Sequence, residues 1–272
     1  MKGIAFGQYY PADSVFHRLD PRVKIILTIL YIVCSFLCKN ILSYALLLAS
    51  ALLLIVLGRI PFKIVFKGLR AVLFVLAFTA VLNIFWTKGE TLLFQWSFIS
   101  IYAEGLYAAA FIIIRIAALI IGTGIFLTYT TTPITLTNAI EDLLSPLKLL
   151  HVPVHSFAMM MTIALRFIPT LSEETEKIMT AQKARGADFT SGGLVARAKA
   201  LIPVLIPLFV SAFNRAGDLA TAMECRCYNG DNGRTRMTVR HLRFWDVIPL
   251  VVTVLFGAAL IWLNILSFGY TA

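Results

Sequence analysis

Two arginines in a short internal repeat are the residues whose type and spacing most clearly imply chemistry. The segment from Thr180 reads Thr-Ala-Gln-Lys-Ala-Arg-Gly-Ala, and 41 residues later the segment from Thr221 reads Thr-Ala-Met-Glu-Cys-Arg-Cys-Tyr. Threonine, alanine and arginine recur at the same offsets, which makes Arg185 and Arg226 equivalent. A guanidinium group is a planar fork that binds carboxylate through two hydrogen bonds. Two such arginines predict two similar receiving grooves, on a partner with two related lobes or subunits.

Each arginine is expected in the last turn of a helix. One predicted helix runs from about Ser172 and stops where Gly186 suits a left-handed backbone. The other runs from about Ala212 and stops before the turn-forming residues 229–233. The helix dipole favours a cation there by roughly 0.3–1 kcal/mol. The position of either arginine alone is equally well explained by the helix dipole, with the side chain in water. The presence of two matching arginines is what favours docking to a partner.

The neighbours of both arginines are small, so each guanidinium is expected on a narrow tip that can enter a groove. The candidate site comprises Ala184, Arg185, Gly186, Cys225, Arg226 and Cys227.

Other reactive residues do not form a recognisable catalytic or metal-binding set. Cys225 and Cys227 have neither a second cysteine pair nor a nearby histidine to complete a zinc site. His151 and His155 have helical spacing, but Pro153 lies between them. The sequence contains no Walker-type phosphate loop and no His-Glu-x-x-His motif. We therefore predict no catalytic residues, no metal and no cofactor.

The composition indicates a polytopic membrane protein. Of the 272 residues 59% are hydrophobic and 14% are charged, whereas soluble domains average about 25% charged residues. Several apolar runs approach the ~20 residues that cross a bilayer. Snorkelling of Lys24, Arg59 and Arg70 is expected to extend the shorter runs. The predicted spans are 25–38, 41–57, 71–86, 106–129 and 244–266.

The basic residues predict the orientation of these spans. Of the 24 lysines and arginines, 21 fall on one side of the predicted membrane and two, Lys39 and Lys88, on the other, with Arg115 inside the fourth span. Because cytoplasmic loops collect Lys and Arg, the amino terminus is expected inside the cell and the carboxy-terminal tail outside. Orientation thus accounts for the net charge of +10, and no nucleic-acid partner is expected.

The predicted fold class is an all-α polytopic membrane protein with about five transmembrane helices and a cytoplasmic helical block between the fourth and last spans. Its regions are a cytoplasmic segment 1–24, a four-span region 25–129, an interfacial block 130–243, and the last span with its external tail, 244–272. The block has apolar runs at 157–165 and 201–213, and Pro203 and Pro207 interrupt the second. We expect these runs to lie along or beneath the membrane. The alternative, that both cross as a hairpin, preserves the parity of the last span.

Two further arginines have open roles. Arg115 is a charge deep in a span, and such residues usually face protein or water and have a partner. Asn83 and Asn138 are candidate partners for it. Arg166 is a candidate to pair with Glu173 or Glu174, or to contact lipid phosphate.

Three segments resemble the transmembrane T component of energy-coupling factor transporters, the vitamin and micronutrient importers of the ATP-binding-cassette class. The first is Gly-Gln-Tyr-Tyr-Pro-Ala-Asp-Ser-Val-Phe-His-Arg-Leu-Asp-Pro-Arg-Val-Lys at 7–24, and another is Ala-Leu-Arg-Phe-Ile-Pro at 164–169. The third is the pair of x-Arg-x motifs. Ala184-Arg185-Gly186 matches the family's typical Ala-Arg-Gly fully, whereas Cys225-Arg226-Cys227 keeps only the arginine.

The resemblance implies a scaffold in the membrane of a prokaryotic cell. The arginine-bearing helix ends would dock into grooves on two ATPase subunits, and a separate S component would bind the vitamin. The chain itself would neither hydrolyse ATP nor select the substrate. A stand-alone secondary transporter or channel is the alternative, although that class often shows two related membrane halves. A membrane enzyme is disfavoured because no acid–base constellation is present.

Overall fold

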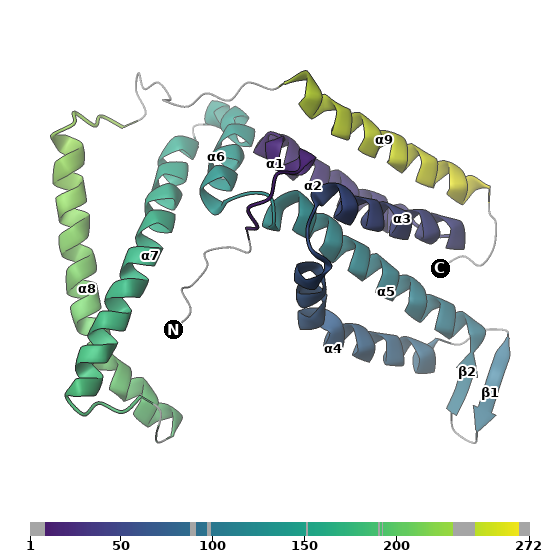
Figure 1. Ribbon diagram of the computed structural model, residues 1–272, viewed down its shortest axis with the longest axis horizontal. Coiled ribbons are helices and arrows are strands. Elements are labelled where there is room, and N and C mark those ends of the chain that lie inside the picture. The colour runs from purple at the N-terminus through teal and green to yellow at the C-terminus, as the bar shows by residue number, and fades with distance from the viewer. Residues whose placement is uncertain are drawn as a thin grey trace. The chain divides into compact units, whose positions relative to one another are not determined.

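The structure is a computed structural model that describes residues 9–87, 91–96, 99–150, 152–189, 191, 193–230 and 243–266 (Figure 1). The described chain is almost entirely helical. Its elements are α1 Val15–Arg18, α2 Pro21–Leu37, α3 Ile41–Gly58, α4 Phe62–Trp86, β1 Leu92–Trp96, β2 Ile99–Tyr102, α5 Ala103–Thr123, a π-helical turn Gly124–Thr128, α6 Pro133–Leu143, a 3-10 segment Ser145–Leu150, α7 Val154–Ala184, α8 Leu194–Glu224 and α9 Phe244–Ile265.

The chain divides into two compact units. Among the described residues, one unit contains 9–136 and 243–266 and the other contains 137–230. The first therefore includes α1 to α5 and α9, and the second includes most of α6 and all of α7 and α8.

The first unit is held by an apolar core between α2, α3, α5 and the π-helical turn. Helix α2 begins where the side chain of Asp20 accepts a hydrogen bond from the backbone amide of Arg22, and Pro21 suits the first helical position. The largest fully buried apolar side chains are Leu27, Tyr44, Leu47, Ile125 and Leu260. These side chains come from α2, from α3, from the π-helical turn that follows α5, and from α9, so the core joins segments far apart in sequence.

Helix α9 is fixed to α2 and α3 by polar contacts at both of its ends. Near its start, the buried carboxylate of Asp246 accepts from the backbone amides of Asp20 (3.2 Å) and Arg243 (2.9 Å). Near its end, Asn264 accepts from the hydroxyl of Ser43 (2.9 Å) and donates to the carbonyl of Leu37 (2.6 Å). These contacts fix the register of the last predicted span against the first two.

Lys24 is buried rather than snorkelling, so that prediction is wrong. Only 1% of the residue is exposed. Its Nζ donates to the carbonyl of Thr130 (2.9 Å) and lies 3.2 Å from the hydroxyl of Thr131, just after the π-helical turn. The backbone is leaving a helix there, and a buried ammonium is tolerated when such oxygens satisfy it.

A β-hairpin and a helix bend were not predicted. Strands β1 and β2 pair antiparallel between α4 and α5, with an irregularity between Leu92 and Phe94. Their sequences are rich in aromatic and β-branched residues, which favour strands. Helix α4 begins nine residues before the predicted third span and bends by 58° between Arg70 and Val72.

Five described helices are long and apolar enough to cross a membrane, and the chain is a multi-pass membrane protein. They are α3, α5 with the turn that follows it, α7, α8 and α9. Three of these coincide with predicted spans, at 41–57, 106–129 and 244–266. The predicted span 25–38 lies in α2, which has only 17 residues, and 71–86 belongs to the bent helix α4. Because α7 and α8 also qualify, length and composition do not exclude the hairpin alternative.

In the second unit, α7 and α8 are longer and more continuous than predicted. Each has 31 residues, so neither begins near Ser172 or Ala212. Helix α7 continues through Pro169, and α8 continues through Pro203 and Pro207. An internal proline removes a backbone hydrogen bond and can kink a helix without ending it. The expectation that proline interrupts the second apolar run is therefore wrong.

Candidate functional site

The end of α7 places Arg185 immediately before a left-handed residue. Gly186 has φ +89°, and its amide donates to the carbonyl of Lys183 (3.0 Å). The next amide, of Ala187, donates to the carbonyl of Gln182 (3.0 Å). This pair of bonds is a Schellman motif, which satisfies the last carbonyls of a helix and turns the chain away from it. A Cβ added at Gly186 would meet nothing within 4 Å, so the helix end stands in open space.

The end of α8 repeats this geometry around Arg226. The amide of Cys227 donates to the carbonyl of Glu224 (2.8 Å), and the amide of Tyr228 donates to the carbonyl of Met223 (3.1 Å). Cys227 takes the place of Gly186, with φ +56°. A residue with a Cβ pays roughly 1–2 kcal/mol for a left-handed conformation. The cysteine therefore keeps the backbone geometry of the glycine at an energetic cost.

The sequence repeat is thus also a structural repeat, with two exposed arginines at equivalent positions of two helix ends. All six residues of the candidate site are exposed. The structure does not bring the two triplets together. Because α8 runs back across α7, their last turns lie at opposite ends of the pair, with α8 ending at the top of the view and α7 at the bottom (Figure 1). The arrangement suits two separate docking points rather than one composite pocket.

A polar cluster joins α7 to α8. The carboxylate of Glu174 accepts from Arg215 Nη2 (2.8 Å) through one oxygen and from the hydroxyl of Ser211 (2.5 Å) through the other. The side chains of Arg215 and Glu174 are 33% and 24% exposed. Glu174 thus pairs with α8, and not with Arg166 as one sequence-based option had it.

Comparisons with known proteins give a consistent family. A family model described as "Cobalt transport protein" matches residues 12–239. The chain is 54% identical over 258 residues to the energy-coupling factor transporter transmembrane protein EcfT of Ruminiclostridium cellulolyticum, covering 94% of this chain and 95% of that one. It is 51% identical to the protein of the same name from Clostridium kluyveri, covering 91% and 92% of the two chains. It is 49% identical to that of Bacillus subtilis, covering 87% and 89%.

The chain belongs to the transmembrane T-component family of energy-coupling factor transporters. The resemblance noted in the sequence is therefore confirmed. A T component is one part of a multi-subunit transporter, and its relatives are named as transmembrane proteins of that transporter rather than as enzymes.

The cysteines and histidines of this T component have ordinary structural environments in the described residues. Cys34 and Cys38 are buried in α2 and at its end, and all four cysteines are free thiols. His155 Nδ1 lies 2.8 Å from a carboxylate oxygen of Glu141, which joins α7 to α6. His151 lies outside the described residues. Within the described ranges, no group of three or more His, Cys, Asp and Glu side chains is placed to hold a metal ion.

Arg115 has partners other than those suggested by the sequence. Its Nη2 donates to the carbonyl of Cys38 (3.1 Å) and to the hydroxyl of Tyr44. The guanidinium carbon also lies 5.4 Å from the centre of the Tyr44 ring and 5.9 Å from that of Phe36. The bonds therefore go to the α2–α3 connection rather than to Asn83 or Asn138. A cation held between a carbonyl and two rings joins α5 to α2 and α3, which favours a structural role.

Sequence reasoning missed the Glu174–Arg215 pair, although the sequence contains a signal for it. These two residues are 41 positions apart, which is the offset that relates Arg185 to Arg226. Opposite charges at equivalent positions of two repeats can meet where the repeats cross. Glu174 and Arg215 lie before the eight residues over which the two copies share sequence, so the similarity alone does not indicate that they pair.

Proposed function

We propose that this T component transmits the ATP-driven motion of two ATPase subunits to a vitamin-binding S component. The observation that carries the proposal is the duplicated helix end, with Arg185 and Arg226 exposed after matching helix terminations. Two like ATPase subunits present two like grooves, and each groove receives one arginine through a carboxylate. The helices then act as rods that move when the ATPase pair closes.

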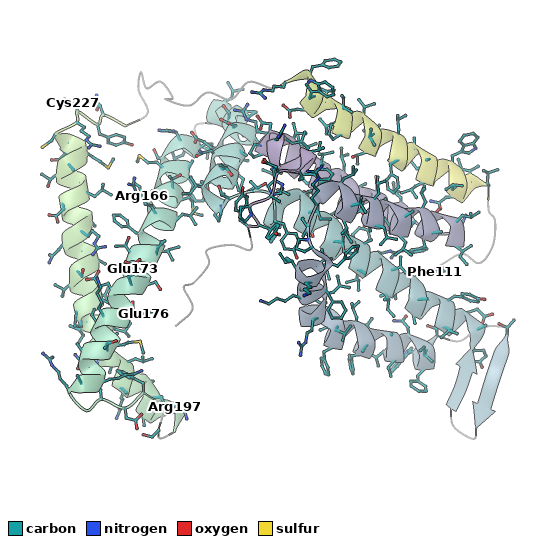
Figure 2. The ribbon with its side chains drawn as sticks, viewed as in Figure 1. Phe111, Arg166, Glu173, Glu176, Arg197 and Cys227 are labelled. Atoms are coloured by element: carbon teal, nitrogen blue, oxygen red, sulfur yellow. The ribbon has the colours of Figure 1, made fainter. Side chains whose placement is uncertain are left out.

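The charges of α7 and α8 support a location beneath the membrane. In α8 the stretch without charge runs from Lys199 to Arg215, which leaves 15 residues or about 22 Å of helix. That is shorter than the ~30 Å hydrocarbon core. In α7, Arg166 is exposed within the apolar half (Figure 2). An arginine facing lipid at mid-span costs about 2.5–3.5 kcal/mol or more.

The distribution of Lys and Arg predicts that the amino terminus lies in the cytoplasm and the carboxy terminus outside the cell. The two arginine tips then face the compartment that supplies ATP. The sequence has no phosphate loop of its own, so hydrolysis belongs to the partner ATPases and choice of vitamin to the S component.

Purification of the chain from its native membrane in mild detergent tests this division of labour. We expect two ATP-binding-cassette ATPase subunits to co-purify with the chain, together with a small membrane protein that binds a vitamin. The stand-alone transporter alternative predicts the opposite result, namely that the chain purified alone and placed in liposomes takes up substrate without ATPase subunits. Such uptake would refute the proposal.

A further inference from the structure

We infer that Glu174 is a positioning residue. Together with Ser211 and Arg215 it forms a pivot, a fixed contact between α7 and α8 about which both helices turn, so that the two arginine tips move together. This inference rests on the proposed function. The pivot lies where α7 and α8 cross, away from Arg185 and Arg226 at the helix ends.

The position of this pivot follows from the repeat. Glu174 and Arg215 are equivalent under the 41-residue offset, and they contact each other at 2.8 Å. When equivalent positions of two repeats touch, the contact lies at the axis that relates the repeats. Arg185 lies 11 residues beyond Glu174, and Arg226 lies 11 residues beyond Arg215. At ~1.5 Å per residue, both arms are about 16 Å long.

The rest of the α7–α8 pair offers little to fix the crossing angle. Among the described residues of the two helices, only Val154, Ala158 and Val204 are buried. Close to the pivot, Val210 and Phe213 are 56% and 74% exposed. A pair of helices with few buried apolar side chains has little packing to resist a change of angle. The carboxylate of Glu174 accepts from two donors on α8. These bonds hold the two helices at one point while the angle between them changes.

Equal arms about a fixed contact have a mechanical consequence. When two docked subunits approach each other, the two tips turn about the same point through similar angles, and the apolar halves on the other side of the pivot turn with them. Without the pivot the helices can slide past each other, so motion at the tips is absorbed before it reaches those halves. Loss of the pivot is therefore expected to uncouple hydrolysis from transport rather than to abolish hydrolysis.

Glu174→Gln in the complete transporter tests the pivot, because the glutamine keeps the size of the side chain and removes the charge that Arg215 binds. With the complex reconstituted in liposomes, we expect ATP hydrolysis within about twofold of the parent. Uptake per ATP hydrolysed should fall by about tenfold, which lies within the range by which single positions change coupling between sites. Glu173→Gln is the matched control, since Glu173 is exposed and adjacent on α7 (Figure 2), and its uptake per ATP should be unchanged.

Exchange of the two charges provides the second measurement. The double variant Glu174→Arg, Arg215→Glu should restore at least about a third of the parent uptake per ATP, as expected for two residues that interact directly. The pivot is refuted if Glu174→Gln leaves uptake per ATP unchanged, if hydrolysis and uptake fall in the same proportion, or if the exchange restores nothing. None of these results bears on the arginine tips, whose own variants test the proposed function separately.

Discussion

Replacement of both Arg185 and Arg226 with alanine is expected to abolish ATP-dependent uptake. Each arginine is exposed in the isolated chain, so the substitution should not affect folding. In the assembled transporter each guanidinium would lie in a groove beside a carboxylate. Removing one partner of such a buried pair costs on the order of 3–5 kcal/mol. Two such losses should remove both the docking of the ATPase subunits and the uptake that depends on it.

Vitamin uptake by cells that contain the complete transporter, together with the amount of ATPase retained on the purified chain, measures this effect. Arg197→Ala is the matched control, because Arg197 is also an exposed arginine of α8 but lies in its first turn (Figure 2). We expect the control to transport normally. Uptake at the parent rate by the double variant would show that the arginines do not have this role.

The Gly122→Ala variant is expected to destabilise the first unit by roughly 1–3 kcal/mol, the usual cost of overpacking a core. At Gly122, α5 lies close against Tyr31 of α2. A Cβ there would overlap the Cε1 atom of the Tyr31 ring and lie 2.5 Å from its Cδ1. The ring cannot move freely, since Tyr31 is 3% exposed and packs edge-on against Phe126 with centroids 5.8 Å apart. The thermal unfolding temperature in detergent measures the loss.

Two further variants make this stability prediction specific. Gly217→Ala is the control, because Gly217 lies inside α8 and a Cβ there would meet nothing within 4 Å. Alanine is the better helix former, so this variant should be unchanged or stabilised by up to about 1 kcal/mol. Adding Tyr31→Leu to Gly122→Ala should recover part of the lost stability. Equal unfolding temperatures for Gly122→Ala and Gly217→Ala would contradict the close approach.

Helices that are uniformly apolar or rich in small apolar residues were predictable from the sequence. The predicted spans 41–57, 106–129 and 244–266 end within one residue of the ends of α3, of the π-helical turn that follows α5, and of α9. The full lengths of α7 and α8 were not predictable in this way. Pro169, Pro203 and Pro207 are expected to interrupt a helix, whereas both helices continue through them. The β-hairpin was missed because its strands are only five and four residues long and lie between two strong helical signals.

The sequence predicts the two helix ends that carry Arg185 and Arg226, but not the arrangement of the two helices. The small residues around Arg185 and the turn-forming cluster after Arg226 are local signals, and local signals fix a helix end. The crossing through Glu174 and Arg215 depends on a contact across 41 residues, which no local pattern specifies. Burial of Lys24 was missed for the same reason, since its oxygen partners follow more than a hundred residues later.

The central claim, that two arginine tips on the cytoplasmic side are held by ATPase subunits, can be tested most directly with the native cysteines. Cys225 and Cys227 flank Arg226 and are exposed, whereas Cys34 and Cys38 are buried. A membrane-impermeant maleimide should label the exposed pair in inside-out vesicles stripped of ATPase subunits, and labelling should fall when the subunits are bound. Intact cells should remain unlabelled, and a Cys225→Ser, Cys227→Ser variant should remain unlabelled throughout. Labelling of the pair in intact cells, or equal labelling with and without the ATPase subunits, would contradict the account.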